Sequence, residues 1–155
     1  MTAIWNSPEW TLRTTQLLDS WKRWIGSELI ERTHPEEDAE RLYKSPFVVV
    51  AHGTETDPLL NYGNLSALRL WQMTIEEFIG TPSRKTAEPI HRDERERLLA
   101  RTRSDGYIDN YSGIRISSTG QRFQIENAVV WNVVDDRGCV IGQAATFGTW
   151  TMLSD

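Results

Sequence analysis

Apolar positions near the start of the chain recur at helical spacing. A helix start is indicated by Ser7-Pro8-Glu9, because serine caps helices, proline tolerates the first helical position and an acid suits the positive end. The apolar residues that follow are three, four or seven positions apart and share one helix face: Trp10, Leu17, Trp21, Trp24, Ile25 and Leu29. The pattern predicts an amphipathic helix that reaches about Glu31 and buries this face.

Beyond that helix the pattern changes to shorter elements. A second helix start at Thr33-His34-Pro35 predicts a short helix, which the Ser45-Pro46 step should end. Residues 47–51 form a compact apolar run that predicts a strand. Residues 52–58 have the composition of a loop, and residues 59–62 are long enough for a second short strand.

The middle of the chain carries clear helix signals. Asn64 is a good N-cap for a helix over residues 66–70, and Thr74-Ile75-Glu76-Glu77 is a capping-box sequence. Residues 91–103 form a highly charged segment that predicts an exposed helix, and Gly106 is suited to end it. This order places three helices between the two short strands and the rest of the chain.

The last third of the chain has strand character. Three β-type runs cover residues 107–117, 122–134 and 140–150, and Thr119-Gly120 and residues 135–138 separate them. Short polar turns between neighbouring runs are typical of antiparallel strands. The pattern therefore predicts a three-stranded meander.

The first turn of the meander also predicts a register. Ser118-Thr119-Gly120 fits a three-residue hairpin loop, which would pair Arg115 with Phe123 and Tyr111 with Asn127. One face then carries the polar and aromatic side chains Tyr111, Arg115, Asn127 and Trp131. A slip of one residue would move such side chains to the opposite face. Both faces contain apolar residues, as expected when helices cover both sides of a sheet.

The order of these elements resembles that of a PAS domain. The segments FVVVAHGTETDP, NYGN, SGIRISSTG and GQAATF are similar to those of the PAS-related MEKHLA family. The resemblance extends over residues 46–150. It implies an α+β fold in residues 46–155, with a PAS-like five-stranded antiparallel sheet and helices on one face. Residues 1–45 would be an N-terminal helical extension. The resemblance also implies a cytoplasmic sensory or regulatory module rather than an enzyme.

Composition narrows the range of partners. Hydrophobic residues make up 39% of the chain and include seven tryptophans, which predicts a folded core. The net charge of −5 disfavours direct binding to nucleic acid. No apolar run approaches the ~18 residues of a membrane helix, and the N-terminus lacks the pattern of a signal peptide. A single cysteine, Cys139, fits a reducing cytoplasm.

Polar residues on the predicted inner face suggest a ligand site. Polar groups on an enclosed face are costly unless they are paired, and a bound ligand is one way to pair them. Arg115 has the planar fork that binds a carboxylate or phosphate. The alternative is that Arg115 simply pairs with Glu126 or another acidic residue on the surface. The residues predicted to bind a small ligand are Trp71, Phe78, Tyr111, Arg115, Asn127 and Trp131.

Other chemistry has weaker support in the sequence. His52, Glu55 and Asp57 offer metal donors, but their spacing matches no strong zinc pattern, so no metal site is predicted. An enzyme would need an acid–base pair in the cavity, and only Asp109, Tyr111 and His52 are on offer.

The cofactor, if any, is not identified by the residues. Light-sensing flavin PAS domains carry a reactive cysteine where this chain has Gly80-Thr81-Pro82-Ser83-Arg84. This difference argues against a covalent flavin adduct, although not against flavin binding. Cys139 has no evident base nearby and is interpreted as an inert thiol.

Three functions therefore compete. The first is a sensor of a small ligand, favoured by the polar residues on the inner face. The second is an interaction module that forms a homodimer through the tryptophan-bearing N-terminal helix. The third is an enzyme on a related curved-sheet scaffold. The contents of the inner cavity would discriminate best among them.

Overall fold

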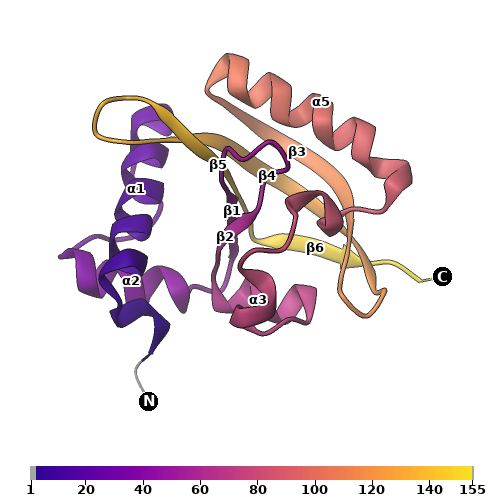
Figure 1. The fold of residues 1–155 in the computed structure, drawn as a ribbon, viewed down its shortest axis with the longest axis horizontal. Helices are drawn as coiled ribbons and strands as arrows, with labels where there is room; N and C mark the ends of the chain where they lie inside the picture. The colour runs from indigo at the N-terminus through magenta and orange to yellow at the C-terminus, as the bar shows by residue number, and fades with distance from the viewer. Residues whose placement is uncertain (1–2, 155) are drawn as a thin grey trace.

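An antiparallel sheet of six strands forms the centre of the computed structural model, which describes residues 3–154 (Figure 1). The strands are β1 Val48–His52, β2 Leu60–Gly63, β3 Tyr107–Ile116, β4 Arg122–Val134, β5 Val140–Phe147 and β6 Thr149–Met152. Their order is β2-β1-β5-β4-β3, and β6 pairs with β4. The α+β, PAS-like arrangement of the sequence analysis is confirmed.

Helices cover both faces of this sheet. They are α1 Pro8–Ile25, α2 Pro35–Tyr43, α3 Leu65–Trp71, α4 Ile75–Phe78 and α5 Pro89–Asp105, with short 3-10 turns η1 Ile4–Asn6 and η2 Ser83–Thr86. The helices α3 and α5 lie on one side of the sheet, and α1 and α2 on the other (Figure 1). Within residues 3–154 no helix combines the length and apolar character needed to cross a bilayer.

The sixth strand comes from a run that the sequence analysis treated as one strand, residues 140–150. Thr146 pairs with Val129 and Thr149 pairs with Glu126, so β6 continues the register of β5 along β4. The interruption lies opposite Asn127, which has a positive φ of 53°. An irregularity in β4 therefore divides the neighbouring strand in two.

The N-terminal helix α1 begins as predicted and ends earlier. The Ser7 side chain accepts a hydrogen bond from the Trp10 amide at 3.2 Å, and Pro8 occupies the first turn. Gly26 then adopts a left-handed conformation, with φ of 88°, and its amide donates to Lys22. The glycine cap ends the helix at Ile25 rather than near Glu31.

The apolar face of α1 packs on the sheet of its own chain. Leu17 is fully buried, and the Trp21 ring meets the Trp131 ring edge-on at 5.1 Å between centroids. The indole N–H of Trp24 donates to the Asn132 carbonyl at 2.9 Å. The hydrophobic face predicted from the sequence is thus used within the chain.

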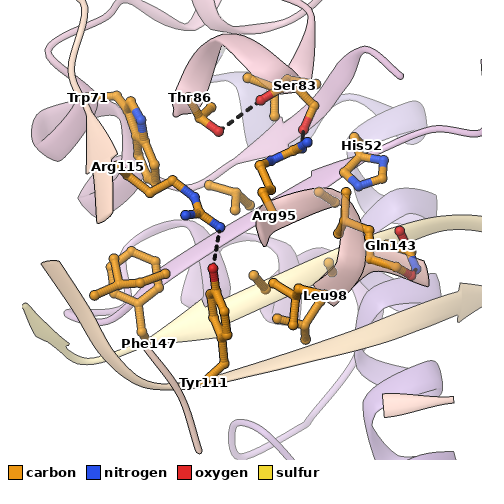
Figure 2. Close-up of a pocket in the computed structure, with 18 residues that line it drawn as sticks. His52, Trp71, Ser83, Thr86, Arg95, Leu98, Tyr111, Arg115, Gln143 and Phe147 are labelled. Carbon is orange, nitrogen blue, oxygen red and sulfur yellow. Dashed lines mark hydrogen bonds between the residues drawn. The ribbon is translucent and has the colours of Figure 1, made fainter. Parts of the chain in front are cut away.

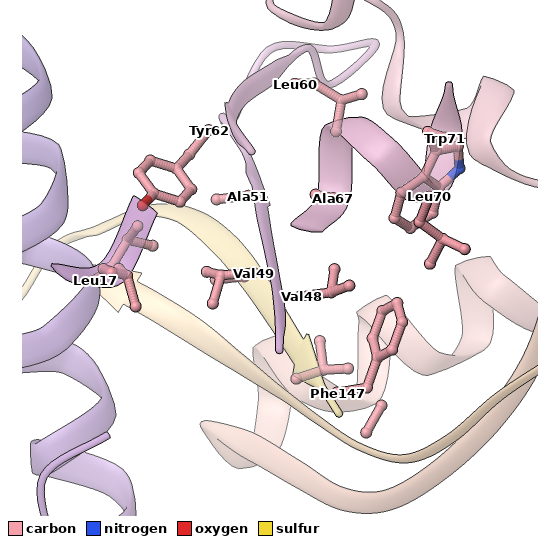
Figure 3. Packing of buried hydrophobic residues seen from close by; sticks show 14 of the residues in the cluster. Leu17, Val48, Val49, Ala51, Leu60, Tyr62, Ala67, Leu70, Trp71 and Phe147 are labelled. Carbon is pink, nitrogen blue, oxygen red and sulfur yellow. The ribbon is translucent and has the colours of Figure 1, made fainter. Parts of the chain in front are cut away.

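The core has two layers, one on each side of the sheet. Figure 3 shows Leu17, Tyr62 and Val49 on the α1 side of β1, and Val48, Phe147 and Trp71 on the α3 side. All six side chains are almost completely buried. The helical segment of residues 3–45 therefore shares a hydrophobic core with the sheet. The proposed division at residue 45 stays a prediction.

A buried asparagine joins the elements around β1. The Asn64 oxygen accepts hydrogen bonds from the amides of Val49 (3.0 Å) and Ala67 (3.2 Å). Its amide group donates to the carbonyls of Leu42 (3.2 Å) and Phe47 (2.8 Å). Asn64 thus caps α3, as predicted, and also binds the end of α2 and the start of β1.

The remaining turn and cap signals are also confirmed. Thr74 and Glu77 form both hydrogen bonds of a capping box at the start of α4. Gly120, with φ of 90°, lies in the hairpin turn between β3 and β4, and Gly106 follows α5. Each of these signals involves residues close in sequence.

Two bulges change the register predicted for β3 and β4. Arg115 pairs with Phe123 as expected, but Tyr111 pairs with Ala128 rather than with Asn127. Asn110 and Asn127 both have φ of 53°, and each lies where the register shifts. Such an extra residue reverses the alternation of side chains beyond it. The face assigned to the C-terminal half of β4 is therefore corrected.

We predict that Asn64→Asp destabilises the protein by about 2–4 kcal/mol, because a carboxylate oxygen would face two buried carbonyls that now accept hydrogen bonds. Urea unfolding measures this loss. Asn110→Asp makes the same chemical change at an exposed position. Aspartate, like asparagine, adopts the positive φ found there, so this variant should keep nearly the stability of the wild type. Equal urea midpoints for Asn64→Asp and the wild type would show that the hydrogen bonds of Asn64 contribute little to stability.

We predict that Trp21→Ala lowers the free energy of unfolding by about 2–3 kcal/mol, because the half-buried indole packs against Trp131. Leu12→Ala serves as the control on the same helix, since Leu12 is 59% exposed and should change stability by no more than about 0.5 kcal/mol. Similar losses in the two variants would contradict docking of α1 on the sheet.

Candidate functional site

A cavity of about 60 Å³ lies between the sheet and the layer of α3, η2 and α5 (Figure 2). A water molecule needs roughly 10–15 Å³ of such space, so several water-sized groups fit. Side chains that line it include Val50, His52, Leu60, Trp71, Ser83, Thr86, Arg95, Leu98, Leu99, Tyr111, Arg115, Ile125, Val130, Gln143, Ala145 and Phe147. Apolar walls with a few polar groups are typical of small-molecule sites.

The sheet supplies the floor of this cavity in two rows. Ala145 pairs with Val50 on one side and with Val130 on the other, so these three side chains share the inner face. The next row has the same orientation and is polar, with Gln143 paired to His52 and to Asn132. The floor therefore changes from apolar to polar along the strands.

The polar row fastens α5 over the sheet. The Gln143 amide group donates to the Leu99 carbonyl at 2.9 Å and to the Asn132 side chain at 3.2 Å. The Asn132 amide group donates to the Arg103 carbonyl at 3.2 Å. Two buried side-chain amides thus hold the helix that brings Arg95 and Leu98 to the cavity.

Arg115 enters the cavity from β3. It is 6% exposed, and its guanidinium donates to the Ile114 carbonyl at 2.9 Å and to the Tyr111 hydroxyl at 3.0 Å. Gly113 lies between these two residues on the same strand, where a Cβ would meet the tyrosine hydroxyl at 2.3 Å. The missing side chain at Gly113 lets Tyr111 and Arg115 turn toward each other (Figure 2).

No carboxylate forms an ion pair with Arg115 among residues 3–154. The alternative partner, Glu126, instead accepts a hydrogen bond from the Thr151 hydroxyl at 3.1 Å. The surface pair weighed in the sequence analysis is therefore wrong. Arg115 is a buried cation whose direct partners are neutral groups.

Tyr111 connects this arginine to the rim of the cavity. Its hydroxyl accepts from Arg115 and donates to the Glu94 carboxylate at 2.9 Å. Burial raises the pKa of Tyr111, while the neighbouring guanidinium opposes that shift. The phenol therefore stays protonated and orients the guanidinium at neutral pH.

A second arginine, Arg95, reaches the cavity from α5. It is 5% exposed and donates to the Ser83 hydroxyl. Its acidic neighbour is Glu96, at 3.3 Å, whose side chain is 66% exposed. Burial, and next the positive charge of Arg115, lower the pKa of Arg95 to about 10. Arg95 therefore remains charged at neutral pH, and the positive charge of Arg115 repels it.

Two further polar groups of the lining have unmet hydrogen-bonding capacity. The His52 Nδ1 contacts the Gly53 carbonyl at 3.0 Å, whereas its Nε2 is buried without a partner among the described residues. The Trp71 indole N–H is likewise buried and unpartnered there. Burial lowers the pKa of His52, so the ring is neutral at neutral pH.

The structure brings together three of the six residues predicted to bind a ligand. Trp71, Tyr111 and Arg115 line the cavity. Phe78 packs behind it, with its ring 6.3 Å from that of Trp71. A ligand contact for these residues stays a prediction.

The expected placement of Asn127 and Trp131 is wrong. Asn127 is exposed at the bulge, and Trp131 lies on the opposite face against Trp21 of α1. The extra residue in β4 reverses the side-chain alternation between Ile125 and Val130. A hairpin turn fixes register only up to the first bulge.

The sequence analysis did not place Arg95 at the site. It lies in the highly charged segment of residues 91–103, for which an exposed helix was predicted. The available signal was its spacing, because Arg95 precedes Leu98 by three residues and Leu99 by four. A residue at that spacing shares the apolar face of the helix and is carried into the cavity.

The residues weighed as metal ligands or as an acid–base pair do not all converge on one site. His52 faces the cavity, the Glu55 carboxylate accepts from the Leu59 amide at 3.0 Å, and Asp57 pairs with Arg84 at 3.2 Å. Asp109 is exposed beside the bulge of β3. Of the possible acid–base groups, the cavity thus holds His52 and Tyr111.

The family model of the MEKHLA domain matches residues 11–152. The chain belongs to the MEKHLA family. The match includes most of α1 and all of α2, so it reaches well into the segment that precedes β1. Among curated proteins, none matches this MEKHLA domain in sequence.

Solved structures with the same fold are PAS and light-oxygen-voltage domains. A PAS domain from Colwellia psychrerythraea has a TM-score of 0.64 and 12% identity, over 72% of this chain and 92% of that one. An RNA-binding light-oxygen-voltage receptor has a TM-score of 0.60 and 16% identity, over 76% of this chain and 36% of that one. A light-oxygen-voltage domain studied with a flavin analogue has a TM-score of 0.59 and 14% identity, over 76% and 84%.

A flavin does not fit this MEKHLA domain as its side chains are placed. The cavity of about 60 Å³ is far smaller than three fused rings require, and Arg95 and Arg115 extend into it. The segment that corresponds to the flavin-reactive cysteine leads into η2, where Ser83 binds Arg95. Cys139 lies exposed in the β4–β5 turn, outside the cavity lining.

We predict that His52→Gln weakens the acid sensitivity of the fold. Burial lowers the pKa of His52 below its unfolded value of about 6.5, so only the unfolded chain gains a proton as the pH falls through that window. Stability is therefore lost on acidification. Melting temperatures at pH 7.5 and 5.5 should differ more for the wild type than for His52→Gln.

The control for this experiment is His91→Gln, in the first turn of α5 and outside the cavity lining. It should keep the acid sensitivity of the wild type. Identical pH dependence for His52→Gln and the wild type would contradict a buried, neutral imidazole at the cavity.

Proposed function

We propose that this MEKHLA domain acts in the cytoplasm as a non-enzymatic sensory module that binds a small molecule between the sheet and α5. One observation carries the proposal. The cavity gathers buried polar groups whose hydrogen-bonding capacity the described residues do not meet, namely His52 Nε2 and the Trp71 indole N–H, beside two cationic side chains. The shared fold supports it, since two of the similar structures are described as light-oxygen-voltage proteins.

The energetic argument is that such a cavity is a poor way to stabilise a fold. Leaving a buried polar group unpaired costs about 1–3 kcal/mol, and burying two like charges adds repulsion. Apolar residues of similar size would fill the same space at lower cost. Groups that reduce stability and converge on one space are typical of binding sites.

The proposal includes a path by which ligand binding in the cavity would affect the helices on both faces of the sheet. Ligand contacts to Arg95 or Leu98 would act on α5, which Asn132 holds through its side chain. The main-chain carbonyl of the same residue accepts from Trp24 of α1. Asn132 therefore contacts the helices on both faces of the sheet. We propose that occupancy of the cavity changes how firmly both helices are held, and that a partner recognises this difference.

The competing proposal is an interaction module that forms a homodimer through α1. Its support is limited to Leu12, which is 59% exposed on that helix. The tryptophan-bearing face on which this proposal rested contacts the chain's own sheet. The ligand-sensing proposal therefore explains more of the buried polar residues.

The proposal predicts that filling the cavity removes ligand. Ala145→Leu would add three carbon atoms to the middle of the apolar floor. Wild-type protein purified from its own source should release a small molecule on denaturation, detected by mass spectrometry, and Ala145→Leu should release much less. Val140→Leu, at the exposed start of the same strand, should behave as the wild type. Equal amounts from all three proteins would place the molecule elsewhere and overturn the proposal.

A further inference from the structure

We infer that the cavity binds a small organic monocarboxylate, with its carboxylate between Arg115 and Arg95 and its apolar part against Leu98, Val130 and Phe147. The inference rests on the proposed function and specifies its ligand. Figure 2 shows the two arginine side chains in the space between Trp71 and His52. They come from different layers, Arg115 from β3 and Arg95 from α5.

The positive charge of the two arginines favours the binding of an anion. Two guanidiniums, each at least nine-tenths buried, face one cavity, and Arg115 has no carboxylate partner within the described chain. An anion between them would convert repulsion into two attractions at a buried site, where charge interactions are stronger than in bulk water. Anion binding would therefore offset the repulsion between the two guanidiniums.

The donors for a carboxylate are still available. The bonds of Arg115 to Ile114 and Tyr111 occupy two of the five N–H groups that a guanidinium carries. Tyr111 fixes the plane of that guanidinium from one side, with its ring centroid 5.5 Å from the guanidinium carbon. A fixed planar fork suits the two oxygens of a carboxylate.

The size of the cavity and the net charge around it narrow the class of ligand further. A space of about 60 Å³ admits a molecule of only a few heavy atoms, and its walls are mostly apolar. Glu94, bound to Tyr111, and Glu96, beside Arg95, offset part of the positive charge at the rim. A monoanion with a short apolar part matches this balance better than a phosphate, which carries more negative charge on average at neutral pH and has no apolar part.

Titration calorimetry and thermal unfolding of the full chain test this inference. The probes are acetate, propionate, butyrate and pyruvate, with propionamide and butyramide as neutral isosteres and inorganic phosphate as the competing anion. At least one monocarboxylate should bind and raise the melting temperature. The neutral amides should not, because they cannot pair with the guanidiniums.

Variants separate a binding role from a structural one. Arg115→Met should weaken carboxylate binding about tenfold or more, while the ligand-free melting temperature stays the same or rises because one of two like charges is gone. Arg95→Met should behave similarly, and Arg115→Lys should restore only part of the affinity. Arg97→Met changes an exposed arginine of α5 and should bind like the wild type.

The outcomes that overturn the inference are distinct. Equal binding of an amide and its carboxylate, binding of phosphate alone, or full affinity in Arg115→Met would each exclude a carboxylate site at the two arginines. A loss of ligand-free stability in both methionine variants would make the pair structural. If Ala145→Leu excludes a bound molecule that is not a carboxylate, the sensory proposal stands and this inference falls.

Discussion

The buried carboxamide of Asn64 is the interaction on which the arrangement of this domain depends. It forms four hydrogen bonds. They join the end of α2, the residues at the start of β1 and the first turn of α3. These segments are distant in sequence, since Asn64 and Leu42 are 22 residues apart. One satisfied polar group thus sets where β1 starts and where α3 begins. Because α3 ends at Trp71, it also sets one wall of the cavity.

At the cavity, by contrast, some buried polar groups lack hydrogen-bond partners among the described residues. Around Asn64 every donor and acceptor of the side chain has a partner, so its burial leaves no hydrogen bond unmade. Around Arg95 and Arg115 the groups are just as buried, yet they are paired mainly with neutral oxygens and oppose each other. The same chain can satisfy buried polar atoms fully at one place. Between the sheet and α5 it leaves the His52 Nε2 and the Trp71 indole N–H without a partner among the described residues, beside two buried guanidiniums.

The sequence predicted the parts of this structure that depend on nearby residues. Caps at Ser7, Asn64 and Thr74 and the hairpin turn at Gly120 involve neighbours within four positions. The register at Arg115 followed from that turn. Asn127 and Trp131 were misplaced because a bulge depends on how β4 meets β3 and β6, which no local pattern records. Arg95 was missed for a related reason. A charged residue at an apolar spacing is ambiguous until the opposite wall of the cavity is known.

The two faces of the sheet are joined at Asn132, and this gives the fold a physical basis for transmitting a change. Its side chain contacts Gln143 and the Arg103 carbonyl on the α5 side, while its own carbonyl accepts from Trp24 on the α1 side. A strand alternates its side chains between faces, so most residues serve only one of them. Asn132 serves both because its backbone and side chain act separately. A ligand that draws Arg95 toward Arg115 would pull on α5, and any resulting movement of β4 would shift the carbonyl that holds Trp24. The position of Asn132, with hydrogen bonds to helices on both faces of the sheet, makes this coupling possible.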